Sequence, residues 1–172
     1  DLSWAQGHAE QAARAAAIMI RSGSALEADY LRLLELYRND APERAYGYAL
    51  QGWQRFLKPQ FWYALVDTGL RSGREQELIH FLQGLDAQQR KVLAADPRSW
   101  MAVSQVYRQA GQLQQALTAA RVAVRLAPDA ADLLSSYLWL LVDLKQSAEL
   151  QPLVRQWEGR LALLPELREP LA

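Results

Sequence analysis

Apolar residues recur three or four positions apart along most of the chain, the spacing that places side chains on one face of an α-helix. Trp100, Val103 and Tyr107 follow this spacing. A polar break at 109–112 comes next, and a second helical stretch with a stripe of alanines follows it. Small side chains on such a stripe let two helices approach closely. The pattern therefore predicts a pair of short antiparallel helices.

Capping residues set the limits of this pair. Asp96 can accept hydrogen bonds from the unpaired N–H groups of a helix that begins at Pro97, because proline suits the first helical position. Gly111 supplies the backbone freedom that a tight turn needs. Pro128 and Asp129 then interrupt the second helix. The unit therefore spans 97–130, a length of 34 residues.

This unit resembles the tetratricopeptide repeat, a helical hairpin of about 34 residues. The family favours tryptophan, tyrosine, two alanines and proline at repeat positions four, eleven, twenty, twenty-seven and thirty-two. These positions are held by Trp100, Tyr107, Ala116, Ala123 and Pro128. The sequence departs from the pattern at position eight, where Ser104 replaces a smaller glycine or alanine.

Weaker copies of the unit keep the same phase on both sides. The resemblance implies an all-α fold, a right-handed α-solenoid of antiparallel helical hairpins that forms a single domain over 1–172. Its expected parts are a half repeat at 1–26, repeats at 27–58, 59–96, 97–130 and 131–164, and a C-terminal tail at 165–172.

Turn signals place the breaks between helices at 4–7, 39–43, 71–74, 109–112 and 145–147. Asp40 and Glu43 have the spacing of a capping box. The 59–96 repeat is longer than the others. We expect its excess around 84–96, as a lengthened second helix or an extra short turn.

Charge and composition exclude several classes of protein. Nineteen basic residues balance nineteen acidic ones, so the broad cationic field of a nucleic-acid binder is missing. The chain has no cysteine, which excludes disulfides and thiolate metal sites. No apolar run is long enough for a membrane span, so we expect no membrane insertion by this chain. The first residue is Asp1, which predicts a piece of a longer protein.

Catalytic chemistry has little support in the sequence. The two histidines, His8 and His80, are far apart and belong to no pair with metal-ligand spacing. Neither a phosphate-binding loop nor a dinucleotide-binding turn is present. We therefore expect no enzyme activity, no metal and no cofactor.

The resemblance implies a binding surface, because fixed first-helix positions of tetratricopeptide repeats face the concave side of the stack. The residues expected to bind a partner are Arg38, Tyr63, Asp67, Arg71, Gln105, Arg108 and Trp139. The same positions include Leu31, Glu35, Asn39, Gln60, Arg98, Met101, Gln109, Asp132, Ser135, Val142 and Asp143. This mixture of arginine, carboxylate, amide and apolar groups is typical of a surface that binds protein. Trp139 is either an anchor for the partner or a filler beneath the next helix.

The alanine- and arginine-rich segment 109–117 resembles the periplasmic tetratricopeptide arrays of bacterial exopolysaccharide export proteins, in particular the Pel-type exporter of biofilm polysaccharide. The resemblance implies a scaffold on the periplasmic side of the outer membrane. Its partner would be a polysaccharide-modifying enzyme, such as a deacetylase or hydrolase, held near the export pore. Two alternatives stay open: a cytoplasmic assembly or chaperone adaptor, and direct polysaccharide binding with Tyr63 and Trp139 as stacking platforms.

Overall fold

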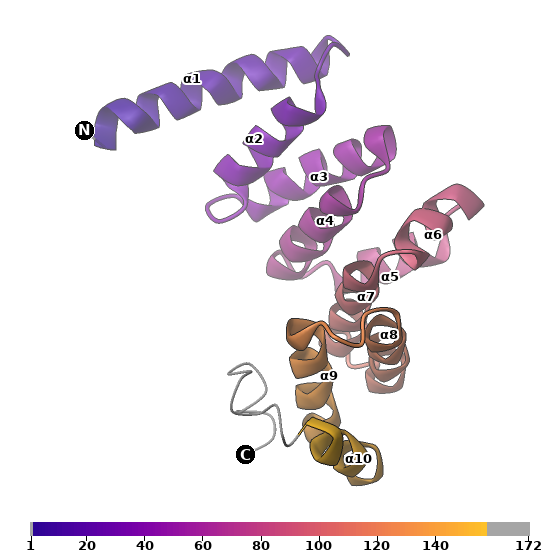
Figure 1. Cartoon of the computed structure of the whole chain (residues 1–172). Helices are drawn as coiled ribbons and strands as arrows, with labels where there is room; N and C mark the ends of the chain where they lie inside the picture. Colours follow the sequence, from indigo (N-terminus) through magenta and orange to yellow (C-terminus); the bar gives the residue numbers. More distant parts are fainter. Residues whose placement is uncertain (1, 158–172) are drawn as a thin grey trace. The chain divides into compact units, whose positions relative to one another are not determined.

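The computed structural model describes residues 2–157, except for the side chains of 2–6, 147, 148 and 157. Within this range every regular element is an α-helix (Figure 1). The predicted all-α stack of helical hairpins is therefore confirmed. The end of the 131–164 repeat and the tail at 165–172 lie outside the described residues.

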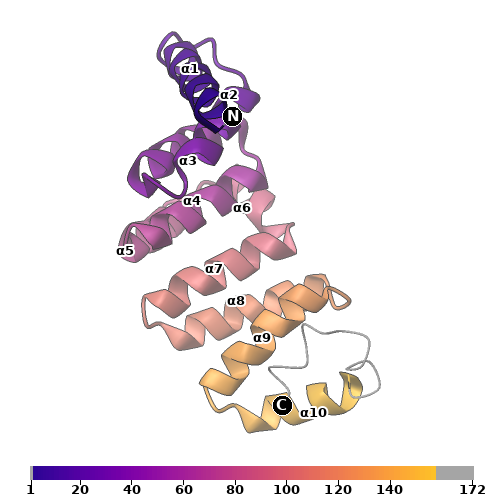
Figure 2. The ribbon, with the colours of Figure 1, turned by 90° about the vertical axis from the view of Figure 1, so that its left-hand side faces the viewer.

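The helices group into two compact units that divide between Leu85 and Asp86. The first unit contains α1 (Leu2–Arg21), α2 (Glu27–Tyr37), α3 (Pro42–Phe56), α4 (Pro59–Arg71) and α5 (Glu75–Gln83). The second unit contains α6 (Ala87–Ala94), α7 (Pro97–Gln109), α8 (Leu113–Leu126), α9 (Ala131–Asp143) and α10 (Ser147–Trp157). In each unit, helices that follow one another in sequence pack side by side, as α7 and α8 show in Figure 2.

The excess length of the 59–96 repeat forms a separate helix, α6. Because α5 ends at Gln83, the second helix is not lengthened. The Asp86 carboxylate caps α6 by accepting from the Gln89 N–H at 2.8 Å, and the Gln89 side chain accepts from the Asp86 N–H at 3.0 Å. This reciprocal cap explains why the segment forms a helix of its own instead of a turn.

One predicted break and one predicted cap are wrong. Segment 4–7, predicted as a turn, is part of the continuous helix α1. A helix tolerates Gly7 at a cost of about 1 kcal/mol, which the flanking helix formers offset. The capping box of Asp40 and Glu43 does not form, since α3 begins at Pro42 and Ala41 occupies the capping position. Pro42 fixes the first helical position, which leaves Asp40 outside the cap.

The other helical breaks lie where the sequence predicts them. The Asp96 carboxylate accepts from the Ser99 N–H at 2.9 Å and caps α7. Gly73 and Gly111 adopt φ angles of 69° and 77° after α4 and α7. Lys145 takes the same left-handed conformation after α9, with φ 54°, although it carries a side chain. The chain thus repeats one turn geometry, and glycine is preferred there without being required.

Aromatic rings fill the core of the first unit. Phe61 and Trp62 on α4 are fully buried, as is Trp53 on α3. The Phe61 ring packs against the backbone of Gly52 so closely that a Cβ there would lie 2.4 Å from the ring. Gly52 therefore forms a notch that lets α3 and α4 approach with a large ring between them.

Alanines fill the corresponding space in the second unit. Ala116, Ala120 and Ala123 on α8 are fully buried, which confirms the predicted stripe. Ser104 on α7, the departure from the repeat pattern, is also buried and donates from its hydroxyl to the Ala116 carbonyl at 2.7 Å. The hydroxyl is thus accommodated by a hydrogen bond to the neighbouring helix.

Candidate functional site

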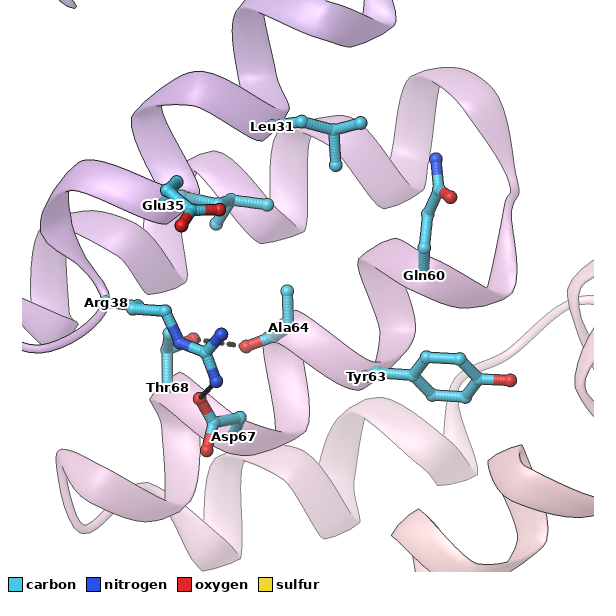
Figure 3. A pocket seen from close by; sticks show the side chains of 9 residues that line it. Leu31, Glu35, Arg38, Gln60, Tyr63, Ala64, Asp67 and Thr68 are labelled. Carbon is cyan, nitrogen blue, oxygen red and sulfur yellow. Dashed lines mark hydrogen bonds and ion pairs between the residues drawn. The ribbon is translucent and has the colours of Figure 1, made fainter. Parts of the chain in front are cut away.

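A hollow of about 530 Å³ lies between α2 and α4 in the first unit (Figure 3). We call it the first-unit hollow. Its wall on α2 includes Leu31, Glu35 and Arg38, and its wall on α4 includes Gln60, Tyr63 and Asp67. Side chains one helical turn apart share a face, which explains how the two helices direct these groups into one space.

An arginine pair shares one carboxylate at the end of this hollow. The Arg38 guanidinium lies 3.3 Å from Asp67 Oδ2, and Arg71 Nε lies 3.0 Å from Asp67 Oδ1. The side chains of Arg38 and Arg71 are 51% and 47% exposed, so solvent weakens both contacts. Both ion pairs therefore contribute little to the stability of the fold.

The opposite end of the first-unit hollow has an acidic centre. Glu27 accepts from the Lys58 ammonium and from the Gln60 side-chain amide. This contact joins the start of α2 to the start of α4. The hollow is thus bordered by polar bridges at both ends, with Leu31 and Tyr63 between them.

A smaller hollow of about 200 Å³ lies between α7 and α9, and we call it the second-unit hollow. Met101, Gln105 and Arg108 line it from α7, and Ser136, Trp139 and Leu140 line it from α9. Trp139 is 38% exposed, whereas Met101 is buried at 6% and forms the floor. A partly exposed tryptophan beside a small cavity is typical of surfaces that receive a large side chain.

Ion pairs brace α7 and α9 on both sides of this hollow. Arg98 pairs with Asp132 near the start of the helices, and Arg108 pairs with Asp143 near their ends. The hydrogen bond from Arg98 lowers the pKa of the Asp132 carboxyl below its ordinary value. All four side chains are about half exposed, so these contacts position the helices more than they stabilise them.

A better-shielded network fixes α10 in the second unit. The Arg121 guanidinium donates two hydrogen bonds to Glu149, and the Tyr137 hydroxyl donates to the same carboxylate. The arginine contact lowers the pKa of Glu149. Burial, followed by the Glu149 contact, raises the pKa of Tyr137 to about 12. The sequence analysis missed this network, because its members lie on different helices and share no repeat position.

The structure brings the predicted binding residues together in two groups. Arg38, Tyr63 and Asp67 line the first-unit hollow, and Arg71 joins them through Asp67. Gln105, Arg108 and Trp139 line the second-unit hollow. Of the wider predicted set, Leu31, Glu35, Gln60 and Met101 also line one of these hollows. Whether either group binds a partner stays a prediction.

No cluster of histidine and carboxylate side chains within residues 2–157 could hold a metal ion. None of the described helices combines the length and apolar character needed to cross a bilayer. Stacked helical hairpins with polar, partly apolar hollows between first helices define the class of helical-repeat interaction proteins.

The sequence profile of the tetratricopeptide repeat family matches residues 1–172. The chain belongs to this family, as the repeat pattern around Trp100 and Tyr107 predicted. Members of the family are generally non-catalytic modules that bind other proteins. No curated protein is significantly similar to the chain.

Proposed function

We propose that the chain is a protein-binding scaffold that holds its partner at the second-unit hollow. The observation that carries this proposal is the position of Trp139. Its indole is 38% exposed although the neighbouring Leu138 and Leu140 are buried, and it borders a cavity with Gln105 and Arg108. A large aromatic side chain beside amide and guanidinium groups is the composition of an interface centre.

We further propose that the partner is a polysaccharide-modifying enzyme and that the scaffold acts on the periplasmic side of the outer membrane, at an exopolysaccharide export pore. The support is the similarity of segment 109–117 to repeats of such export proteins. The non-catalytic character of the family agrees with a recruiting role. In this role the scaffold would raise the local concentration of the enzyme near the exported polymer.

Capture from separated cell fractions tests this function. The immobilised chain should retain a polysaccharide deacetylase or hydrolase from periplasmic extract of a polysaccharide-exporting bacterium. The variant Arg108→Ala/Trp139→Ala should retain at least tenfold less enzyme, since truncating interface anchors commonly costs about 1.4 kcal/mol or more of binding free energy. Its melting temperature, followed by circular dichroism, should not change. The matched control is Arg125→Ala/Leu126→Ala, which removes an arginine and an exposed apolar residue from α8.

Two outcomes would contradict the proposal. Equal capture by the Trp139 variant and by the wild type would exclude the second-unit hollow as the binding surface. Capture of a cytoplasmic chaperone or assembly factor, with none from the periplasmic extract, would favour the adaptor function instead.

Direct polysaccharide binding is the second candidate, because an exposed indole can also stack on a sugar ring. Titration with soluble oligosaccharides, followed by tryptophan fluorescence, separates the two functions. We expect a flat response, and a saturable response that Trp139→Ala removes would favour the polysaccharide.

A further inference from the structure

The first-unit hollow has one carboxylate, that of Glu35, that makes no direct ion pair among the described residues. Glu35 is exposed on α2, and within the described part of the chain it has no hydrogen bond or ion pair. It also lines a neighbouring hollow of about 360 Å³ between α1 and α2. The carboxylates of Glu27 and Asp67 around the same space are, by contrast, each in contact with basic groups. A ligand that enters here therefore meets Glu35 as an open acceptor.

An excess positive charge lies at the end of the hollow, where Arg38 of α2 and Arg71 of α4 meet at Asp67. Arg38 and Arg71 share the single carboxylate of Asp67, so this group of three side chains has one positive charge in excess. Figure 3 shows Arg38 turned toward Asp67, with Glu35 one turn earlier on the same helix. The hollow thus presents a negative and a positive centre side by side.

The two centres are close enough together for one extended polypeptide to reach both. Glu35 and Arg38 are three residues apart, a rise of about 4.5 Å along an α-helix. Alternate residues of an extended chain point to the same side and are about 7 Å apart. Long side chains bridge the difference. An extended segment can therefore place one residue at each centre.

We propose that the first-unit hollow binds an extended segment of the partner protein that carries a basic and an acidic residue two positions apart. The basic residue pairs with Glu35, and the acidic residue pairs with the Arg38–Arg71 side. This inference rests on the proposed function, because it specifies the partner surface that a protein-binding scaffold would take.

Apolar contacts support a basic side chain in this position. Leu31 is 37% exposed beside Glu35, and Tyr63 forms the wall of the hollow on α4. The methylene stem of a lysine or arginine can cover Leu31 while its charged end reaches Glu35. A segment with only one sign of charge would place a like charge against one of the two centres.

Synthetic peptides test the charge pattern. The probes are acetylated and amidated heptapeptides of alanine with Lys-Ala-Glu, Lys-Ala-Lys, Glu-Ala-Glu, Gln-Ala-Glu or Lys-Ala-Gln at the centre. Each is titrated into the ¹⁵N-labelled chain, and the Kd is taken from amide shifts on α2 and α4. We expect Lys-Ala-Glu to bind about threefold more tightly than any other peptide, the difference that one exposed ion pair supplies. Equal affinities, or shifts confined to other helices, would overturn the proposal.

Single substitutions assign each charge to its centre. Glu35→Gln should make Lys-Ala-Glu and Gln-Ala-Glu bind equally, because the lysine has lost its acceptor. Arg71→Gln should make Lys-Ala-Glu and Lys-Ala-Gln bind equally, since the remaining Arg38–Asp67 pair is neutral. Glu43→Gln on α3 and Arg14→Gln on α1 remove the same charges elsewhere and should leave every Kd unchanged. A charge preference that persists in Glu35→Gln would overturn the assignment.

The two proposals fail separately. If the peptides show no preference but Arg108→Ala/Trp139→Ala still loses the captured enzyme, the charge pattern is wrong and the scaffold function stands. If the peptides bind as expected and Trp139 has no effect on capture, the first-unit hollow is the partner surface and the second-unit site is wrong.

Discussion

Different side chains pack the helices together inside each of the two units. In the first unit, α4 places the fully buried ring of Phe61 against α3, and Gly52 provides the space for it. In the second unit, α8 presents a stripe of buried alanines to its neighbours. The family pattern describes the second solution only. The first shows that a notch of one glycine can replace a stripe of small residues.

The difference predicts how each unit responds to substitution. Packing in the first unit is concentrated in a few rings, since Phe61 contacts both Tyr30 and Phe56 at centroid distances of 6.2 and 5.7 Å. Packing in the second unit is spread over the alanines and several buried leucines, among them Leu117, Leu134 and Leu138. Single changes should therefore have larger effects in the first unit.

Phe61→Ala should give the largest loss. The substitution removes a fully buried ring and leaves a cavity between α3 and α4, which typically costs about 3–5 kcal/mol of unfolding free energy. Urea unfolding followed by circular dichroism measures the change. A loss below about 1 kcal/mol would mean that the Phe61 ring contributes little to the stability of the first unit. The expected difference in sensitivity between the two units would then be wrong.

Gly52→Ala should cost about 1–3 kcal/mol, because the new Cβ would lie 2.4 Å from the Phe61 ring. Gly47→Ala is the matched control on the same helix. A Cβ there meets nothing within 4 Å, so it should gain about 0.5–1 kcal/mol from helix propensity. Both changes are measured by the same urea unfolding.

A double-mutant cycle then tests the notch itself. In a Phe61→Ala background, Gly52→Ala should no longer be destabilising, because the atoms it would meet are gone. If Gly52→Ala is as favourable as Gly47→Ala in the wild-type chain, the notch has no energetic role.

Glu149→Gln tests the charge contacts that distinguish the second unit. The Arg121 contact lowers the pKa of Glu149, so its stabilising effect is present above the ordinary value of 4.5 and is lost as pH falls through the lowered value. The substitution should cost about 1 kcal/mol at pH 7, and the difference from wild type should shrink near pH 3. Asp67→Asn in the first unit breaks more exposed pairs and should cost less. A pH-independent difference for Glu149→Gln would exclude the ionic contact as its cause.

Local signals explain what could be predicted from the sequence. Asp96 as a cap, Gly73 and Gly111 as turns, and the alanine stripe each depend on neighbours within a few residues, so their residue types suffice. The turn predicted at Gly7 was wrong because glycine ends a helix only where the adjacent residues do not continue it, and here they do. The separate helix α6 was missed because the cap between Asp86 and Gln89 was not recognised.

Contacts between distant residues explain what could not be predicted. Repeat phase placed Arg38 and Asp67 on the same side of their helices, but their pairing depends on distances that the phase does not give. The approach of Phe61 to Gly52 likewise depends on how closely α3 and α4 pack. The sequence was thus enough to predict which residues line the candidate surfaces, but not which of their charged side chains pair with one another.

Ser104→Ala should have the smallest effect. It tests how α7 packs against the alanine stripe of α8 in the second unit. The change removes the hydrogen bond to the Ala116 carbonyl, worth about 0.5–1.5 kcal/mol, but alanine is the better helix former by about 0.5 kcal/mol. The net loss in urea unfolding should therefore be about 0.5 kcal/mol.

Val66 occupies the same repeat position in the first unit and is buried there. Ser104→Val should cost more, about 1–3 kcal/mol, because it removes the hydrogen bond and adds a second branch at a buried position beside Ala116. If valine is tolerated as well as alanine, the second unit is not packed more tightly at this position, and the two units differ in composition alone.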